Sequence, residues 1–520
     1  MNQRYIFYYD TITLITCIVG MILSKSLISI GMVLLTFDFL FLGSWKEKWQ
    51  KLKSQKVLLV VMLIYPALHI VSLLWSSNVT QGLIDINKKM ALIVFPLTIC
   101  AMSPLKKETF KYCFIVYLLA IFAATIWGSI NFFTHNYIDT RTLMGGCSHV
   151  RFALNIVFAI ICVAWIVYNK RRTLGNTLLC LLSIYVVWLG CYILFAQLTT
   201  AVVLLAIMTL IALPYYCIKK ISSLVAKIVL LIYVGAILVS VFWIRKEYKY
   251  FFTPNVIYSQ PLVKTTPQGN TYYFGSKEII ENGNYVYYFW NPDEMKTVWK
   301  QRTGEDIGDK FNVLLRYLNS ISPYKDAQHV KALSNQDIDN INRGIANKAY
   351  INTFSLTPRL YKLFWQIGAY KGFGQVKNFS ELQRLELWAN ATRVIRNNFL
   401  IGCGCGDVHS VFTEYLCRNK SQLCGMGLKA HNQYLYTFAT FGLLGLVLFL
   451  FYLIYPPIRQ GAFNSVIYCA FFFIVCASMI SEDTLDSVQG IMFYIFLNSI
   501  MLFNSKQIIF PKALRRDNFA

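Results

Sequence analysis

Twelve apolar runs along the chain constrain its fold more than any other feature. Each run is near the length that crosses a hydrocarbon core as a helix. The runs are 11–23, 27–42, 57–75, 91–103, 112–133, 152–168, 178–195, 200–218, 228–244, 434–455, 466–480 and 491–503. Only 14% of the residues are charged, whereas a soluble domain usually has about 25%. The sequence therefore predicts an all-α polytopic membrane protein with about twelve transmembrane helices.

The placement of basic residues supports this count and gives an orientation. With a cytoplasmic N-terminus, 20 Lys and Arg residues lie on the cytoplasmic side and 5 lie in the short loops opposite. Such an asymmetry is typical of multi-pass membrane proteins. The predicted cytoplasmic segments are 46–56, 106–111, 169–172, 219–227 and the basic tail at 512–516.

A long polar segment separates the ninth run from the tenth and divides the chain into three parts. We expect helices 1–9 over residues 1–244, an external loop domain over 245–430, and helices 10–12 with the basic tail over 431–520. The loop segment holds 24 basic and 15 acidic residues, a net charge of +9. Because this segment is expected outside the cytoplasm, its positive charge does not indicate a nucleic-acid partner. The charge favours an anionic ligand.

Local patterns in the loop segment predict a small, mostly helical domain. Alternating apolar residues around Asn282–Gly283–Asn284 favour a β-hairpin or a short extended pair. Leucines spaced at helical periods follow, and we expect a helix over 380–400 capped by Ser380.

His431 and Asn432 lie directly at the start of the tenth run, where the loop domain meets the membrane. In one interpretation His431 is an interfacial residue without a chemical role, and Gly442 and Gly445 allow close helix packing. In the other, the imidazole acts as a general base or as a hydrogen-bond partner of a reacting oxygen.

Five stretches in order along the chain resemble the O-antigen ligase and O-antigen polymerase superfamily. The stretch HNQYLYTFATFG has the His-Asn pair, nine residues and glycine of that group's signature. The other stretches are LWSSNVTQGLIDINKKMALIVFPL (74–97), CSHVRFALNIV (147–157), QRLELWANATRVIRNNFLIGCGCGD (383–407) and SEDTLDSVQGIMFY (481–494). Together they extend nearly from one end of the chain to the other.

The resemblance implies a glycosyltransferase of the bacterial inner membrane with its large loop in the periplasm. Such an enzyme takes a glycan from undecaprenyl pyrophosphate and passes it to an acceptor hydroxyl, in the ligases a core sugar of lipid A. It implies no cofactor, no nucleotide sugar and no metal. An O-antigen or exopolysaccharide polymerase and a protein O-oligosaccharyltransferase remain alternatives, since they share the donor and differ in the acceptor.

Carried over residue by residue, the resemblance makes His431 and Arg384 the expected catalytic residues. It places Trp388 one helical turn beyond Arg384, in the donor site, and adds Asn432 to the substrate-binding residues. An arginine guanidinium suits a pyrophosphate because it is permanently charged and binds two oxygens at once. The alternative for Arg384 is a solvated helix charge paired with Glu381 or Glu386.

The chain departs from the family at a middle span, where an arginine is usual and this sequence reads LFAQLTTAVV. Either Arg151, at the external start of the sixth run, or a loop arginine such as Arg316 replaces it in binding the donor, or this chain binds its donor differently. The alternative for Arg151 is snorkelling at the membrane interface.

The stretch GCGCGD (402–407) has the wrong spacing for a nucleotide-binding loop, and leaves a plain turn or an anion-binding nest as alternatives. The external cysteines are Cys147, Cys403, Cys405, Cys417 and Cys424. Disulfides, free thiols and a zinc site all remain open for the last four. If disulfides form, we expect Cys403 and Cys405 to bond to Cys417 and Cys424.

A secondary transporter is the competing function from another class, since twelve spans is a common count for carriers. Carriers typically show two related halves and broken helices at the membrane midplane. This sequence has no clear internal repeat, and its one large domain lies late in the chain.

Overall fold

The computed structural model describes residues 3–102, 104–135, 148–219, 223–255, 263–351, 355–377 and 379–504. Cys147 and the basic tail at 512–516 lie outside the described residues. Helices account for most of the described chain, which confirms the all-α prediction. Two small two-stranded sheets are the only sheets in this part of the chain.

Every predicted apolar run that the structure describes forms a helix. The helices before the loop domain are α1 (Gln3–Leu23), α2 (Lys25–Phe41), α3 (Trp45–Ser54), α4 (Lys56–Val71), α5 (Val79–Lys88), α6 (Ala91–Ala101), α7 (Lys107–His135), α8 (His149–Lys170), α9 (Asn176–Phe195), α10 (Thr199–Lys219) and α11 (Leu224–Phe252). Those after it are α19 (Gln433–Arg459), α20 (Val466–Ser481) and α21 (Val488–Phe503).

These helices differ in how well their lengths suit a membrane. Seven of the described helices are long and apolar enough to cross one, or eight if α2 and α3, which meet at a bend of 108°, form one broken span. The apolar helices Thr199–Pro214, Val466–Ser481 and Val488–Phe503 are shorter. A multi-pass membrane protein is therefore supported, and the count of twelve spans stays a prediction.

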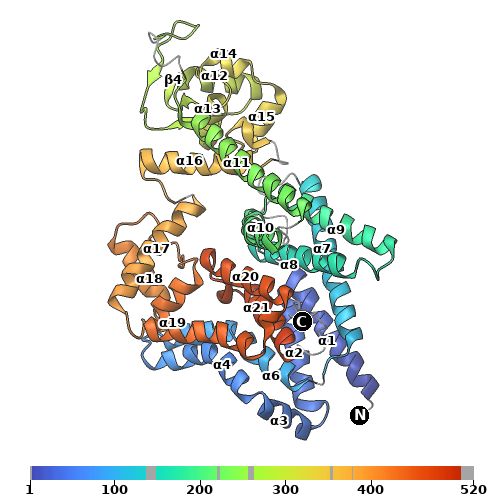
Figure 1. Cartoon of the computed structure of the whole chain (residues 1–520). Coiled ribbons are helices and arrows are strands. Elements are labelled where there is room, and N and C mark those ends of the chain that lie inside the picture. The colour runs from blue at the N-terminus through green and yellow to red at the C-terminus, as the bar shows by residue number, and fades with distance from the viewer. Residues whose placement is uncertain are drawn as a thin grey trace.

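The last three helices pack into the first half of the chain. Helix α21 packs against α6, α19 against α4, and α20 against α8. Figure 1 shows α19–α21 in red lying among the blue N-terminal helices. This packing brings the loop between α20 and α21 next to elements that lie hundreds of residues earlier in the sequence.

The loop domain lies between α11 and α19, with α11 extending eight residues beyond its predicted end at 244. Its helices are α12 (Pro292–Thr303), α13 (Phe311–Asn319), α14 (Ala327–Lys331), α15 (Asn335–Asn342), α16 (Thr357–Phe373), α17 (Ser380–Asn397) and α18 (Val408–Arg418). Its strands are β1 (Tyr273–Phe274), β2 (Ile280–Glu281), β3 (Asn284–Tyr285) and β4 (Tyr288–Trp290). In Figure 1, α12–α15 lie at the far end of the molecule from α1–α6, and α17 and α18 lie beside α19.

Two local predictions in the loop domain have different outcomes. The hairpin is confirmed, since β2 pairs antiparallel with β3 and the turn residues Asn282 and Gly283 have φ of 55° and 75°. The cap at Ser380 is wrong. Phe379 occupies the N-cap position of α17 without a side-chain hydrogen bond, and the Ser380 hydroxyl donates to Glu381 at 2.9 Å.

The predicted cysteine pairing is also wrong. The disulfide joins Cys417 to Cys424, which flank the end of α18. Cys403 and Cys405 are buried free thiols. Each donates to a backbone carbonyl of a membrane helix, Cys403 to Ala439 and Cys405 to His69, both at 3.2 Å.

The glycine-rich stretch 402–407 inserts into a break in α19. Gly442 has φ of 67° inside this helix. The carbonyls of Ala439 and Thr440 accept the amides of Cys403 and Gly404 at 3.0 and 2.8 Å. A Cβ atom on Gly402 would lie 2.3 Å from the Thr440 carbonyl carbon, and one on Gly442 would lie 2.2 Å from the Leu400 carbonyl carbon. These glycines are needed because two backbones meet here.

Candidate active site

The segment between α20 and α21 presents three carboxylates within five residues. Glu482, Asp483 and Asp486 are 7%, 6% and 10% exposed, Asp486 measured on its side chain. Buried carboxylates require charged or hydrogen-bonding partners. Each of the three has a different set of partners, and together they bring four distant parts of the chain to one place.

Glu482 lies beside three side chains that the sequence predicted as site residues. Its Oε1 lies 2.9 Å from Nη2 of Arg384 in α17. Its Oε2 lies 3.2 Å from Nη1 of Arg151, in the first turn of α8, and 3.8 Å from Nδ1 of His431. We call Glu482, Arg384, Arg151 and His431 the Glu482 cluster. Residues from three separated segments thus converge on one carboxylate.

The two arginines and the histidine of the Glu482 cluster are open to solvent to different degrees. The side chain of His431 is 35% exposed, that of Arg384 28%, and that of Arg151 14%. Burial raises the pKa of Glu482, but the neighbouring His431, Arg151 and Arg384 outweigh it and hold this pKa at about 2. Glu482 is therefore ionised at neutral pH, beside two guanidinium groups and an imidazole that remain partly exposed.

Asp483 and Asn432 fix the backbone that carries His431. His431 has φ of 46°, a conformation that non-glycine residues rarely adopt. The two Asp483 oxygens accept the amides of His431 and Asn432 at 3.1 and 3.0 Å. The Asn432 side chain caps α19 by accepting from Leu435 at 3.0 Å and donates to the Ile480 carbonyl at 2.9 Å. An unusual backbone held by several contacts is a mark of functional positions.

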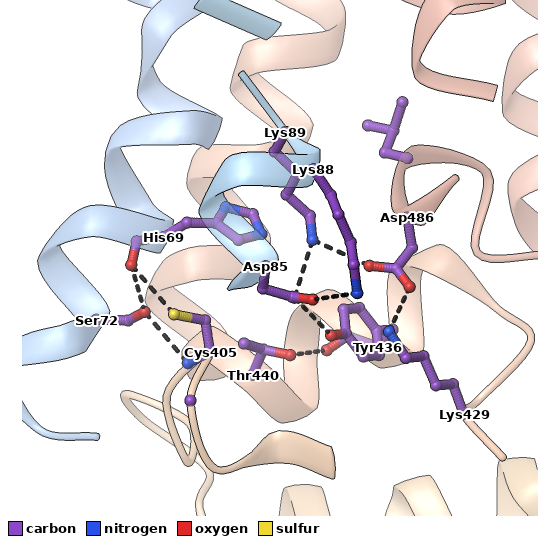
Figure 2. A network of polar contacts seen from close by, with 12 residues as sticks. His69, Ser72, Asp85, Lys88, Lys89, Cys405, Lys429, Tyr436, Thr440 and Asp486 are labelled. Carbon is purple, nitrogen blue, oxygen red and sulfur yellow. Dashed lines mark hydrogen bonds and ion pairs between the residues drawn. The ribbon is translucent and has the colours of Figure 1, made fainter. Parts of the chain in front are cut away.

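Asp486 binds a second set of cations, shown in Figure 2. Its Oδ1 lies 3.0 Å from Nζ of Lys89, and its other oxygen binds Lys429. Lys89 also lies 3.0 Å from Asp85 in α5, whose Oδ2 is 3.4 Å from the Tyr436 hydroxyl. We call Asp486, Lys89, Asp85 and Lys429 the Asp486 network.

Lys89 and Asp85 of the Asp486 network are buried more deeply than the Glu482 cluster, whereas the Lys429 side chain is 26% exposed. The Lys89 side chain is 1% exposed and that of Asp85 4%. The pKa of Lys89 is raised, since Asp486 and Asp85 outweigh the effect of its burial. The pKa of Asp486 is held at about 2 because Lys89 and Lys429 outweigh the burial that would raise it.

The glycine-rich stretch joins the same region to the end of α4. Asp407 accepts the amides of Ser77 and Asn78 at 2.6 and 2.9 Å. The Cys405 amide donates to the Ser72 hydroxyl oxygen at 3.2 Å, and Figure 2 shows Cys405 and Ser72 beside His69. The amides of Cys403 and Cys405 thus bind protein oxygens, so this stretch acts as a packed turn.

The other predicted site residues lie apart from Glu482 or have other contacts. Trp388 lies one turn beyond Arg384 on α17, and its buried Nε1 has no hydrogen-bond partner among the described residues. Arg316 binds both oxygens of Glu281 at 2.9 Å and stacks over Trp365 inside the loop domain. The structure therefore brings together Arg384, Arg151 and His431, with Asn432 as a cap, and holds Arg316 elsewhere.

A guanidinium does reach the middle-span region that lacks an arginine of its own. Gln197, between α9 and α10, has φ of 51°, and its carbonyl accepts Nη2 of Arg359 from α16 at 3.1 Å. Sequence reasoning did not select Arg359, because 162 residues separate it from Gln197.

Sequence reasoning also missed the acidic half of the site. Glu482, Asp483 and Asp486 lie in SEDTLDS at the predicted external end of an apolar run, and Asp85 and Lys89 form a pair with helical spacing. Three acids in a seven-residue loop between two apolar runs would have been a usable signal, since such residues at a membrane boundary are costly without partners.

A comparison with known protein families finds a match in the region that holds part of this site. Residues 335–450 match the family model described as O-antigen ligase, a range that contains Arg384, Trp388, His431 and Asn432. No curated protein matches the chain. This match supports the O-antigen ligase and polymerase superfamily that the sequence predicts.

Proposed function

We propose that this chain is an O-antigen ligase-like glycosyltransferase at the periplasmic face of a bacterial inner membrane. It moves a glycan from undecaprenyl pyrophosphate to an acceptor hydroxyl, with a lipid A-core sugar as the first candidate acceptor. The convergence of two guanidinium groups and an imidazole on Glu482 is the observation that carries this proposal.

Arg384 and Arg151 bind the pyrophosphate of the donor in this proposal. Glu482 contacts one terminal nitrogen of each arginine, which leaves other N–H donors of both guanidinium groups for phosphate oxygens. Charge develops on the pyrophosphate as the anomeric carbon–oxygen bond breaks, and donors already in position stabilise this charge without reorganisation. Trp388 lies one turn along α17 and lines the same approach.

His431 acts on the acceptor. Its Nδ1 faces Glu482, so Nε2 is the ring nitrogen available to an incoming hydroxyl. A neutral imidazole takes the proton of that hydroxyl as its oxygen bonds to the anomeric carbon, and the pyrophosphate leaves with the electron pair of the broken bond. The exposure of His431, the highest in the cluster, suits a group that meets a second substrate.

The first experiment is complementation in cells that lack the chromosomal copy of this gene. His431→Ala and Arg384→Ala should each abolish glycan transfer, read on a gel of surface glycolipids. Arg393→Ala is the matched control, because this arginine is exposed on the same helix α17 as Arg384. Membrane levels of all three variants should equal those of the wild type, and transfer by His431→Ala or Arg384→Ala would refute the assignment.

The same cells identify the acceptor. Loss of long chains on lipid A, with polymer accumulating on the carrier lipid, indicates a ligase. Lipid A that carries only a single repeat unit indicates a polymerase. Unaltered lipopolysaccharide with underglycosylated proteins indicates a protein-directed transferase.

A further inference from the structure

The loop domain contains a cleft of about 670 Å³ that the proposed reaction does not use. It lies between residues 268–273 and helix α12, in the part of the loop domain farthest from helices α1–α6 (Figure 1). A space of this size is within the range that holds small ligands.

A buried carboxylate fixes the two walls of this cleft relative to each other. Glu294, in the first turn of α12, accepts hydrogen bonds from Thr266 at 2.6 Å and Asn270 at 2.7 Å. Its second oxygen accepts the Ala327 amide at 3.1 Å. Tyr272 adds a further link by donating to Asp326. The walls are thus held in place before any ligand arrives, which lowers the cost of binding.

Polar groups facing the cleft are left without partners. Within the described part of the chain, no hydrogen bond or ion pair engages the side chains of Gln268, Asp293 and Gln301. Asp293, Thr297 and Gln301 follow one another at four-residue intervals, so they share one face of α12. Tyr273 adds an aromatic ring that is 51% exposed.

The lining contains two carboxylates, four carboxamides and two tyrosines, and it has no Lys, Arg or His. Two carboxylates without a neighbouring cation disfavour a phosphate ligand, in contrast to the Glu482 cluster. Carboxamides and carboxylates both accept hydrogen bonds from hydroxyl groups, and carboxamides also donate to them. The Tyr273 ring offers an apolar surface for the C–H face of a pyranose.

We propose that this cleft binds an uncharged or amino-substituted saccharide unit within the glycan that the enzyme transfers. The inference rests on the proposed function for the origin of the saccharide. Because the cleft lies far from the Glu482 cluster along the loop domain, it binds units remote from the reducing end. It thereby favours long glycan chains over single repeats.

Direct binding tests the cleft independently of catalysis. The probe is the oligosaccharide released by mild acid from the carrier lipid of the source cells, presented to the purified full-length chain in nanodiscs. Saturation-transfer NMR should detect binding that Tyr273→Ala/Gln301→Ala weakens about tenfold or more, which is about 1.4 kcal/mol. Lys300→Ala is the control, since Lys300 neighbours Gln301 but is paired with exposed Asp306. Equal binding by the cleft variant and the wild type would overturn the proposal.

Transfer assays separate this proposal from the proposed function. Thr297→Trp, which fills the cleft without removing a wall contact, and Tyr273→Ala/Gln301→Ala should raise the KM for multi-repeat donors about tenfold. Transfer of single-repeat donors should stay at the wild-type rate. Wild-type KM values for both donor lengths would overturn the cleft proposal and leave the glycosyltransferase standing. Saccharide binding without any transfer by the wild type would overturn the proposed reaction and leave the cleft standing.

Discussion

Glu482 and Asp486 lie four residues apart in one loop, and each carboxylate binds cations from distant helices. Their surroundings differ. Asp486 binds Lys89, whose side chain is 1% exposed, whereas Glu482 binds Arg384 and His431, which are 28% and 35% exposed. The contacts of Lys89 with Asp85 and Asp486 therefore join α5 to the last helices in a buried place, whereas Arg384 and His431 beside Glu482 remain partly exposed.

This difference follows from burial rather than from the residue types. A buried ion pair is costly to break because removal of one partner leaves the other charge without compensation. A pair open to solvent exchanges its partner for water or a ligand at a smaller cost. We infer that changes to the Asp486 network affect folding first, and changes to the Glu482 cluster affect transfer first.

Acidification acts on both carboxylates and should have the largest effect on stability. The pKa values of Glu482 and Asp486 are held at about 2, below their ordinary values of 4.5 and 3.8. Their stabilisation is complete above the unfolded pKa values and is lost as the pH falls through about 2, together roughly 6 kcal/mol. Unfolding in detergent should therefore become easier between pH 4.5 and pH 2.

Asp483 should act in the opposite direction. Burial and the charge of Asp486 raise its pKa to about 6, so its contribution is present below pH 3.8 and is lost as the pH rises through about 6. Asp483→Asn should flatten the pH dependence of the free energy of unfolding above pH 4. The loss of stability between pH 4.5 and pH 2 should stay unchanged. A wild-type free energy of unfolding that does not change between pH 4.5 and pH 2 would contradict the roles assigned to Glu482 and Asp486.

Removal of the buried cation should have the next largest effect. Lys89→Met leaves Asp85 and Asp486 facing each other in a buried site, and the free energy of unfolding should fall by about 3–5 kcal/mol. Lys88→Met is the control, because Lys88 is 45% exposed and lies 3.7 Å from Asp85, so it should change this free energy by less than about 1 kcal/mol. Equal melting temperatures for the two variants would mean that burial does not separate these lysines.

Glu482→Gln should have the smallest effect on stability and a clear effect on transfer. It removes the charge beside both arginines and His431, at a cost of about 3 kcal/mol in unfolding, as the lowered pKa of Glu482 implies. The rate of glycan transfer should fall about tenfold to a hundredfold. Lys89→Met should retain most of its transfer activity per folded molecule, measured at low temperature. The reverse ranking of the two variants in transfer would break the distinction between cluster and network.

Much of the fold could be predicted because apolar periodicity and turn chemistry are local. The apolar runs became helices, and Asn282–Gly283 formed the predicted turn since both residues accept positive φ. Helix boundaries were less predictable: α11 continues to Phe252 through a charged stretch, which composition alone marks as loop. The order of the five family-like stretches also predicted the superfamily, which the match over 335–450 supports.

The site could be predicted only in its cationic half. His431, Arg384 and Arg151 were each selected separately, but their shared partner Glu482 depends on packing between segments up to 331 residues apart, a separation that no local pattern encodes. The stretch GCGCGD was ambiguous for the same reason. Gly402 is explained by the broken backbone of α19 at Gly442, and Gly404 and Gly406 by their close approach to residues 72–78. These contacts become visible only when the segments meet.

The most direct measurement is the binding of sugar-free undecaprenyl pyrophosphate to the purified chain in nanodiscs. We predict that Arg151→Ala/Arg384→Ala weakens this binding about a hundredfold or more, since two charged hydrogen-bonding partners of the diphosphate are lost. Arg393→Ala should bind as the wild type does. Wild-type affinity in the folded double variant would contradict the claim that Glu482 orients a pyrophosphate site.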